Sequence, residues 1–233
     1  MKQVLAICGS KSKNSKSLYF LKLLKEQFVN YSDINFKIIS PDDYYLSYVS
    51  GSNDMFIKGE DIDDIDDDGN FIKEEILNSE FIIVNSPVYS LNVSANIKNL
   101  IDRLSSWGHT FKLLGVPGIT LSVGSGRGHL EVEAYLDFMF SSFGMNIIRN
   151  LNFTNKEDIE QYNFKVLERE IIERIYSSKE FIPSLLQEQQ FQEHKNLISK
   201  QPKHFYEYKY WEETGLLYSE NLYEYVKNKN SLT

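Results

Sequence analysis

Cysteine is nearly absent from this chain, with Cys8 alone among 233 residues. One cysteine cannot form a disulfide within the chain, so a reducing compartment such as the cytoplasm is expected. No histidine or second cysteine stands beside Cys8. We therefore expect a small buried side chain at this position rather than a reactive nucleophile.

Long hydrophobic runs and an excess of positive charge are also missing. No apolar stretch approaches the roughly 20 residues that span a membrane. The first residues run directly into a strand pattern, so no signal peptide is expected. Lys and Arg number 25 against 33 Asp and Glu, which gives a net charge of −8. That sign disfavours nucleic acid and anionic membrane surfaces as partners.

Apolar runs and helical patterns alternate along the first part of the chain. Strands are predicted near 2–8, 34–39, 80–86, 115–123 and 145–151, and helices near 15–30, 70–78, 92–107 and 129–143. This alternation is typical of an α/β fold with right-handed crossovers and a parallel sheet. Five strands with this spacing suit the order 2-1-3-4-5, which places the first and third strands side by side.

Two loops follow these neighbouring strands. The first is Gly9-Ser10-Lys11-Ser12-Lys13-Asn14-Ser15-Lys16-Ser17, and the second is Ser86-Pro87-Val88-Tyr89. Hydroxyl and ammonium groups at a helix start suit a phosphate, although Ser and Asn are also common helix caps. No Gly-x-x-x-x-Gly-Lys-Ser/Thr loop occurs, which disfavours ATP or GTP hydrolysis.

As a pair, these loops resemble those of the NAD(P)H-dependent FMN reductase family of flavodoxin-like proteins. There the first loop reads roughly Gly-Ser-x-Arg-x-x-Ser and holds the FMN phosphate, and the second reads Ser/Thr-Pro-x-Tyr and runs along the isoalloxazine ring. The resemblance covers about residues 1–150 and includes Lys98 and Ile101-Asp102-Arg103. It implies a flavodoxin-like five-stranded parallel sheet with helices on both faces, here with a C-terminal helical extension. The implied cofactors are FMN and NAD(P)H, with FMN contacts at Ser10, Ser12, Asn14, Ser15, Lys16, Ser17, the backbone of Leu18, Pro87, Val88, Tyr89 and Ser90.

The first loop departs from the family pattern, because Lys11 or Lys13 stands where an arginine is usual. Lysine is a point charge and holds a phosphate with less directional precision than the arginine fork. This departure bears on individual contacts more than on the fold.

A third loop, Gly124-Ser125-Gly126-Arg127-Gly128-His129, follows the strand at 115–123. The matching family loop is glycine-rich and lies near the flavin ring, so the resemblance gives that role to Gly124, Ser125, Gly126 and Gly128. The alternative is a flexible turn before a helix. Arg127 could pair with a phosphate or carboxylate or lie on the surface. His129 could supply a proton, although such a histidine more often covers a helix start.

Residues 41–69 break the alternation and end in an acidic run, Glu60 to Gly69. Iron–sulfur flavoproteins, a related branch, carry a compact cysteine motif in this region. This chain has no cysteine there, which excludes a thiolate-ligated cluster. The glycine of a calcium loop starting at Asp63 falls out of register, so the run is expected to be solvated or to lie at a helix N-terminus. Asp102 and Arg103 are neighbours on a helix and do not face each other, so we expect structural or interfacial roles for both.

The chain is expected to divide into a flavodoxin-like FMN-binding domain, 1–180, and an aromatic-rich helical tail, 181–233, which Pro183 and Pro202 divide. Aromatic side chains in such number indicate packing. Three roles stay open for the tail: cover for the sheet's own edge, an arm across a partner subunit, or a lid over the flavin.

Together these features predict an FMN-dependent oxidoreductase that takes hydride from NAD(P)H and reduces a second small-molecule acceptor. Because the cofactor carries this chemistry, no catalytic acid, base or metal ion is required from the protein. A cytoplasmic homodimer or homotetramer is expected, with no nucleic-acid or membrane partner. A flavodoxin-like electron carrier and a non-catalytic regulator stay open as alternatives.

Overall fold

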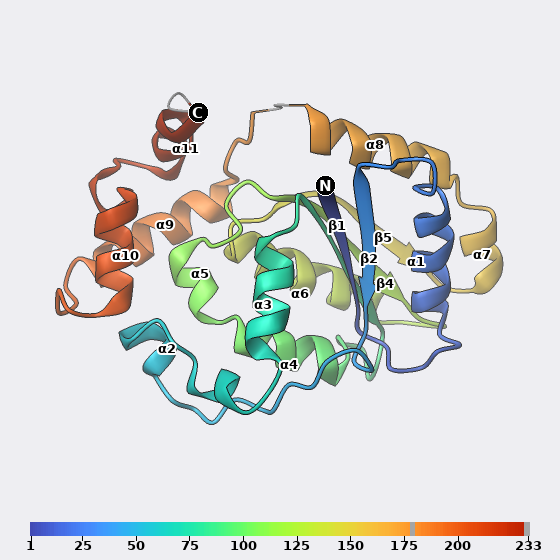
Figure 1. Cartoon of the computed structure of the whole chain (residues 1–233), viewed down its shortest axis with the longest axis horizontal. Helices are drawn as coiled ribbons and strands as arrows, with labels where there is room; N and C mark the ends of the chain where they lie inside the picture. The colour runs from blue at the N-terminus through green and yellow to red at the C-terminus, as the bar shows by residue number, and fades with distance from the viewer. Residues whose placement is uncertain (178–179, 231–233) are drawn as a thin grey trace.

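A sheet of five parallel strands forms the centre of the molecule (Figure 1), in a computed structural model that describes residues 1–177 and 180–230. The strand order is β2-β1-β3-β4-β5, so the predicted order 2-1-3-4-5 is confirmed and the fold is flavodoxin-like. All seven residues of β3 are buried, as expected for a central strand covered on both faces. The bounds are β1 (Lys2–Cys8), β2 (Ile34–Ile39), β3 (Phe81–Pro87), β4 (Pro117–Val123) and β5 (Asn146–Phe153).

Helices cover both faces of this sheet. One hydrophobic cluster joins the sheet to α1 (Lys16–Glu26), α7 (Lys156–Glu160) and α8 (Phe164–Tyr176). A second cluster joins the opposite face to α3 (Gly69–Leu77), α4 (Ala95–Arg103) and α6 (His129–Ser142). Cys8 lies in the first cluster and is fully buried, and this burial raises the pKa of its thiol. The prediction of a small buried side chain at Cys8 is therefore confirmed.

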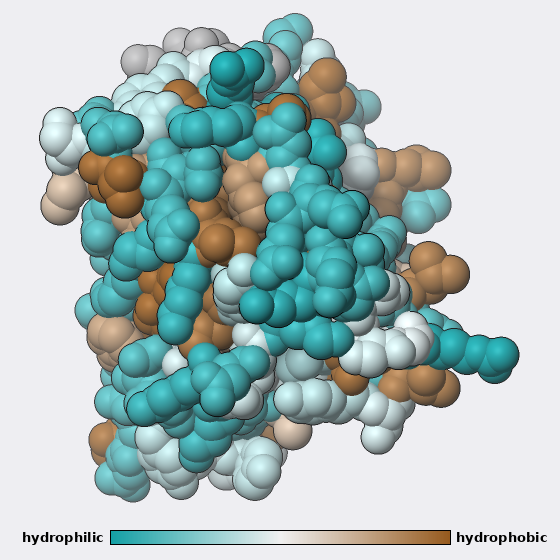
Figure 2. Space-filling view, turned by 90° about the vertical axis from the view of Figure 1, so that its right-hand side faces the viewer, coloured by the Kyte–Doolittle hydropathy of each residue, from teal (hydrophilic) through white to brown (hydrophobic). Residues whose placement is uncertain are grey.

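The face that carries α1 and α7 is mostly hydrophilic (Figure 2). Hydrophobic side chains show in a recess between hydrophilic ridges and in scattered groups along the margins of this view. α7 and α8 were not predicted from the sequence, although they complete the cover of this side of the sheet.

The helix predicted over 92–107 is in fact two helices, α4 and α5 (Ser106–Thr110). Ser94 caps the start of α4, because its Oγ accepts a hydrogen bond from the backbone N–H of Ile97 at 3.3 Å. At the other end Leu104 leaves the helical region with ψ near 9°, and the chain turns before α5 begins. The apolar spacing that predicted one helix is thus shared by two packed segments.

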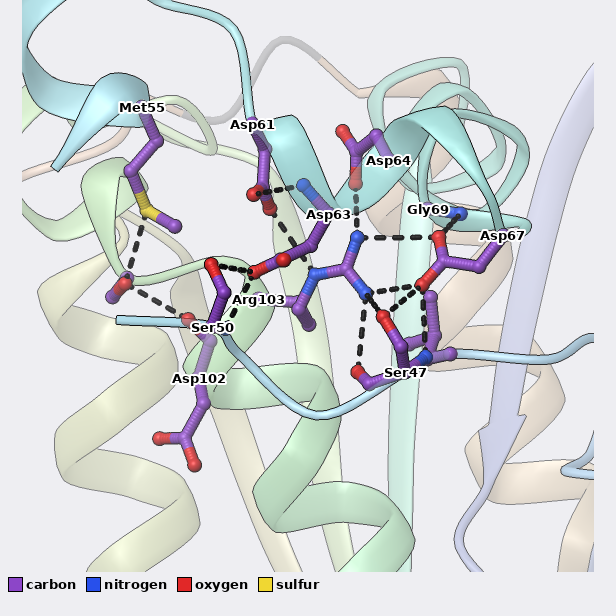
Figure 3. Close-up of polar contacts among 12 residues, drawn as sticks. Ser47, Ser50, Met55, Asp61, Asp63, Asp64, Asp67, Gly69, Asp102 and Arg103 are labelled. Carbon is purple, nitrogen blue, oxygen red and sulfur yellow. Dashed lines mark hydrogen bonds and ion pairs between the residues drawn. The ribbon is translucent and has the colours of Figure 1, made fainter. Parts of the chain in front are cut away.

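Residues 41–68, named here the acidic strap, cross the outside of α3 and α4. The strap holds α2 (Asp54–Ile57) and a 3₁₀ turn, η1 (Ile62–Ile65). Its carboxylates converge on Arg103, whose side chain has no exposed surface (Figure 3). Arg103 Nε lies 3.1 Å from Asp61 Oδ2, Nη2 lies 2.5 Å from Asp64 Oδ1, and Nη1 lies 2.5 Å from Asp67 Oδ2. Lys73 of α3 pairs with Asp61 and Asp64 as well.

This cluster corrects the expectation of a solvated acidic run. The side chains of Asp61, Asp64 and Asp67 are exposed by only 3%, 7% and 1%. Burial alone would raise the pKa of Asp67, but hydrogen bonds from Arg103 and from Ser47 outweigh it and lower that pKa to about 2. The structural role expected for Arg103 is confirmed, since it ties the strap to the end of α4.

The tail folds into α9 (Leu185–Ile198), α10 (Tyr206–Thr214), the 3₁₀ turn η2 (Leu216–Tyr218) and α11 (Leu222–Asn230). Its helical character is confirmed for the described residues. Trp211 is fully buried, stacks on Phe191 and donates from Nε1 to the carbonyl of His109 in α5 at 2.7 Å. The side chain of Gln187 donates to the carbonyls of Ser141 and Met145.

The tail therefore packs on helices α5 and α6 of its own chain. It covers this helical layer rather than an edge strand, so sheet-edge cover, one of the three roles left open above, does not match these contacts. It lies at the opposite end of the molecule from α1 (Figure 1), which does not fit a lid over the first loop.

Among the described residues, no helix is long and apolar enough to cross a membrane. In the same part of the chain, no three His, Cys, Asp or Glu side chains are grouped so as to hold a metal ion.

Candidate functional site

Three loops meet at the carboxyl edge of the sheet. With the strand and helix ends that the structure gives, the first loop is residues 9–15 after β1, the second loop is residues 88–94 after β3, and the third loop is residues 124–128 after β4. β3 pairs with both β1 and β4, and the strands are parallel, so all three loops emerge side by side. Ligands of open α/β sheets bind at this edge, where the strand order reverses.

The first and second loops are joined at Gly9. Its N–H donates to the carbonyl of Asn85 at 2.7 Å, and its carbonyl accepts from Ser94 Oγ at 2.8 Å. A Cβ added at Gly9 would lie 2.4 Å from Ile97 Cγ1, so only glycine allows α4 to approach this closely.

The second and third loops are joined at Val88. Its N–H donates to the carbonyl of Val123 at 2.9 Å. Gly128 has φ of +104°, and a Cβ there would lie 2.6 Å from Val88 Cγ1. At Gly124 a Cβ would lie 2.8 Å from Val88 Cβ. The two glycines therefore let the third loop close on the second.

Lys16 joins the first loop to the third. Its Nζ donates to Ser125 Oγ at 2.7 Å and to the carbonyl of Thr154 at 2.9 Å. Lys16 is the first residue of α1, and Ser15 caps that helix by accepting from the N–H of Leu18 at 3.1 Å. The N–H groups of Lys16 and Ser17 have no protein partner among the described residues, so they remain open donors at the positive end of α1.

The remaining residues expected at the phosphate differ in exposure. Ser12 and Asn14 are exposed, whereas Ser10 and Ser17 are only 2% exposed. Ser10 Oγ accepts from the N–H of Ser12 at 3.3 Å, so it shapes the turn of the first loop.

The second loop contains a tight turn between Tyr89 and Asn92, which exchange two backbone hydrogen bonds. Ser90 and Leu91 form its corner with φ of +50° and +62°, a region that residues with a Cβ rarely enter. Such strain costs on the order of 1 kcal/mol or more per residue and gathers at functional sites. Tyr89 and Leu91 remain about half exposed beside the crevice.

Buried polar groups without a partner lie at the same edge. Asn85 has no exposed surface, yet neither its Oδ1 nor its Nδ2 has a partner among the described residues. Asn85 pairs in register with Cys8 and alternates with Ile83, which places its side chain on the α1 face below the first loop. Buried carboxamides are nearly always hydrogen-bonded, so this one favours a polar ligand or bound water near the first loop.

A chain of hydrogen bonds that was not predicted fixes His129. Its Nδ1 lies 2.7 Å from Ser122 Oγ, which donates to Asn152 Oδ1 at 2.5 Å, and Asn152 Nδ2 donates in turn to Glu133. His129 is the first residue of α6, which agrees with the helix start that the sequence indicated at this position. Polar residues at every second position of β4 and β5, Thr120 with Ser122 and Asn150 with Asn152, were the sequence signal for this network.

Comparisons with known proteins show which family has a sequence like that of this chain. A family model described as NADPH-dependent FMN reductase matches residues 2–158. An iron–sulfur flavoprotein of Archaeoglobus fulgidus is 34% identical over 103 residues, which cover 43% of this chain and 45% of that protein. The FMN-dependent NADH:quinone oxidoreductase 2 of Xanthomonas euvesicatoria is 30% identical over 98 residues, which cover 36% of this chain and 45% of that protein. The chain thus spans less than half the length of either relative.

Solved structures show the same fold. An azoreductase of Bacillus anthracis superposes with a TM-score of 0.52 at 16% identity, over 75% of this chain and 97% of that one. RosB superposes with a TM-score of 0.55 at 10% identity, over 76% of this chain and 78% of that one. The family model covers well over half of the chain and includes all three loops, and the chain therefore belongs to the NADPH-dependent FMN reductase family.

Proposed function

We propose that this protein is an FMN-dependent oxidoreductase that takes hydride from NAD(P)H and passes electrons to a second, small-molecule acceptor. The observation that carries the proposal is the meeting of the first and second loops at the ends of the adjacent strands β1 and β3. Membership of the FMN reductase family supports it. The relative named as an FMN-dependent NADH:quinone oxidoreductase supports it as well.

In this proposal the first loop and the start of α1 hold the FMN phosphate. The open N–H groups of Lys16 and Ser17, the positive end of the helix dipole and the ammonium of Lys16 all suit a dianion. The N–H of Leu18 is already bonded to Ser15 Oγ, so its part in phosphate binding requires a shared hydrogen bond. The residues proposed for the phosphate are Ser10, Ser12, Asn14, Ser15, Lys16, Ser17 and the backbone of Leu18.

The second and third loops form the walls for the ring. Pro87 fixes the backbone where β3 ends, and Tyr89 offers a flat aromatic face to the crevice. The strained turn after Tyr89 keeps this wall in one shape. The residues proposed along the ring are Pro87, Val88, Tyr89, Ser90, Gly124, Ser125, Gly126 and Gly128.

When bound, FMN supplies the redox chemistry, since it can accept a hydride from the nicotinamide and give two electrons to an acceptor. The protein binds and orients both partners between its loops. It also limits the access of water to the crevice, and the joined backbones of the three loops serve that purpose.

A homodimer or homotetramer is part of the proposal. α6 has an outer stripe with Leu130 75% exposed and Phe138 52% exposed, and the half-exposed Leu91 lies beside Gly128 at the start of this helix. Exposed apolar stripes of this kind are typical of association surfaces. The net charge of −8 disfavours nucleic acid and anionic membranes as partners. The cytoplasm is the proposed location.

The test is the visible absorption spectrum of the purified protein mixed with FMN, before and after anaerobic NADPH. Bound flavin that bleaches with NADPH and recovers with an electron acceptor supports the proposal. Lys16→Gln should weaken FMN binding about tenfold, while Lys25→Gln, at the far end of α1, should leave it unchanged. A colourless protein in excess FMN would refute the proposal. Bound flavin that NADPH reduces only through an added reductase would indicate an electron carrier instead.

A further inference from the structure

A cavity of about 380 Å³ opens beside the start of α1, and no residue of the second loop lines it. It is lined by Lys13, Asn14, Ser15, Lys16, Tyr19, Lys22 and Lys156. This volume is within the range of ordinary small-molecule sites. The residues come from the first loop, from α1 and from the start of α7, so two separate segments of the chain form its walls.

The charge of this cavity is opposite to that of the whole protein. Four lysines line it and no carboxylate does, in a chain of net charge −8. Among the described residues, Lys13 and Lys22 have no carboxylate within 4 Å. Lys156 pairs with Glu160 at 3.3 Å and also lies over the ring of Tyr19 at 4.6 Å, which orients its ammonium at the cavity wall. Two cations without a carboxylate partner, Lys13 and Lys22, gather with Lys16 and Lys156 around one cavity, and this concentration of positive charge favours an anionic ligand.

The cavity is longer than one phosphate needs. Ser15, Tyr19 and Lys22 are spaced i, i+4 and i+7, so they lie on one face of α1. Seven residues of helix rise about 10 Å. The FMN phosphate, in the function proposed above, sits at the Ser15 end and uses the open N–H groups there. Lys22 and Lys156 lie beyond that end, and the FMN contacts do not use them.

We propose that Lys22 and Lys156 form a second phosphate subsite, which takes the 2′-phosphate on the adenosine half of NADPH. This inference rests on the proposed function, because that function brings the dinucleotide to the same edge of the sheet. NADH lacks this phosphate, so the charge-assisted contacts of the subsite give a preference for NADPH over NADH.

The test compares Lys22→Gln/Lys156→Gln with a matched control, Lys25→Gln/Lys58→Gln. Lys25 lies on α1 like Lys22 but outside the cavity, and Lys58 forms an exposed i,i+4 pair with Asp54 as Lys156 does with Glu160. Binding of 2′,5′-ADP to the FMN-saturated protein is measured by calorimetry, and FMN and FAD affinities are measured by flavin fluorescence. The KM values for NADPH and NADH complete the comparison.

The cavity variant should bind 2′,5′-ADP about tenfold more weakly or worse, with FMN affinity and the KM for NADH within twofold of the parent protein. The KM of the cavity variant for NADPH should rise by a factor similar to its loss of 2′,5′-ADP affinity. The control variant should equal the parent protein in 2′,5′-ADP affinity, FMN affinity and both KM values.

Equal 2′,5′-ADP binding in both variants would overturn the inference. So would an equal loss of FMN affinity, because the lysines would then belong to the FMN phosphate site. A parent protein that prefers FAD to FMN, with the preference lost in the cavity variant, would assign the subsite to the cofactor's own second phosphate. A parent protein that binds no flavin refutes the proposed function, while its 2′,5′-ADP affinity can still be measured.

Discussion

Replacement of Arg103 by leucine tests how much the buried ion pairs of the acidic strap contribute to the stability of the fold. Arg103→Leu removes the buried cation that Asp61, Asp64 and Asp67 share. Breaking a buried ion pair by removal of one partner costs about 3–5 kcal/mol of unfolding free energy, because the charge left behind is uncompensated. Lys73 still pairs with Asp61 and Asp64 in the variant, so the loss falls mainly on Asp67.

The assay is urea unfolding at pH 7, followed by circular dichroism, together with a thermal scan. For a chain of this size each kcal/mol lowers Tm by about 2–4 °C, so the expected fall is about 6–20 °C. Arg149→Leu is the control, since Arg149 is 41% exposed and its one ion pair among the described residues is with Glu170. Such a surface pair contributes about 0–1 kcal/mol.

A second readout is how the difference in unfolding free energy between the parent protein and Arg103→Leu depends on pH. Arg103 keeps the folded-state pKa of Asp67 near 2, below its ordinary 3.8. The stability from this pair is therefore fully present above pH 4 and is lost as the pH falls toward 2. The difference in unfolding free energy between the parent protein and Arg103→Leu should therefore become smaller between pH 4 and pH 2. A loss under about 1 kcal/mol at pH 7, or a gap that does not change with pH, would refute the reasoning, because buried pairs must differ from surface pairs in both respects.

Two further changes test other contacts. Gly128→Ala should weaken FMN binding at least tenfold and lower Tm, because the added Cβ meets Val88 at 2.6 Å and φ is +104°. Gly108→Ala in α5, where an added Cβ meets nothing closer than 3.9 Å, is the control, and equal effects would contradict this account. Trp211→Ala should lower the unfolding free energy by about 3–5 kcal/mol. In limited proteolysis the tail of this variant should be cleaved earlier than the sheet domain, and simultaneous cleavage of both would show that the tail does not open by itself.

The sheet and its three loops could be predicted from the sequence because their signals are local. Each strand is a short apolar run, and each loop begins where that run ends. The order of the strands followed from the spacing of the crossovers. The break between α4 and α5 could not be predicted, because the apolar positions of both helices keep one continuous spacing while the turn depends on packing around Leu104.

The acidic strap shows the limit of local patterns most clearly. Asp61, Asp64 and Asp67 stand about 40 residues before Arg103, and nothing in a run of acidic residues indicates that a distant arginine will be buried among them. A solvated run and a buried cluster have the same local sequence. The site raises a similar difficulty, since the unpartnered carboxamide of Asn85 can be recognised only when its neighbours in space are known.

The corner of the second loop carries serine and leucine where glycine would fit without penalty. Glycine at Ser90 or Leu91 would relax the folded backbone, but it would also free many more conformations of the unfolded chain and of the loop itself. With side chains at these two positions, the loop is strained in the folded state but has fewer alternative backbone conformations. An inflexible wall presents the same contour to every molecule that enters, so discrimination at this edge would arise from goodness of fit rather than from adjustment of the backbone.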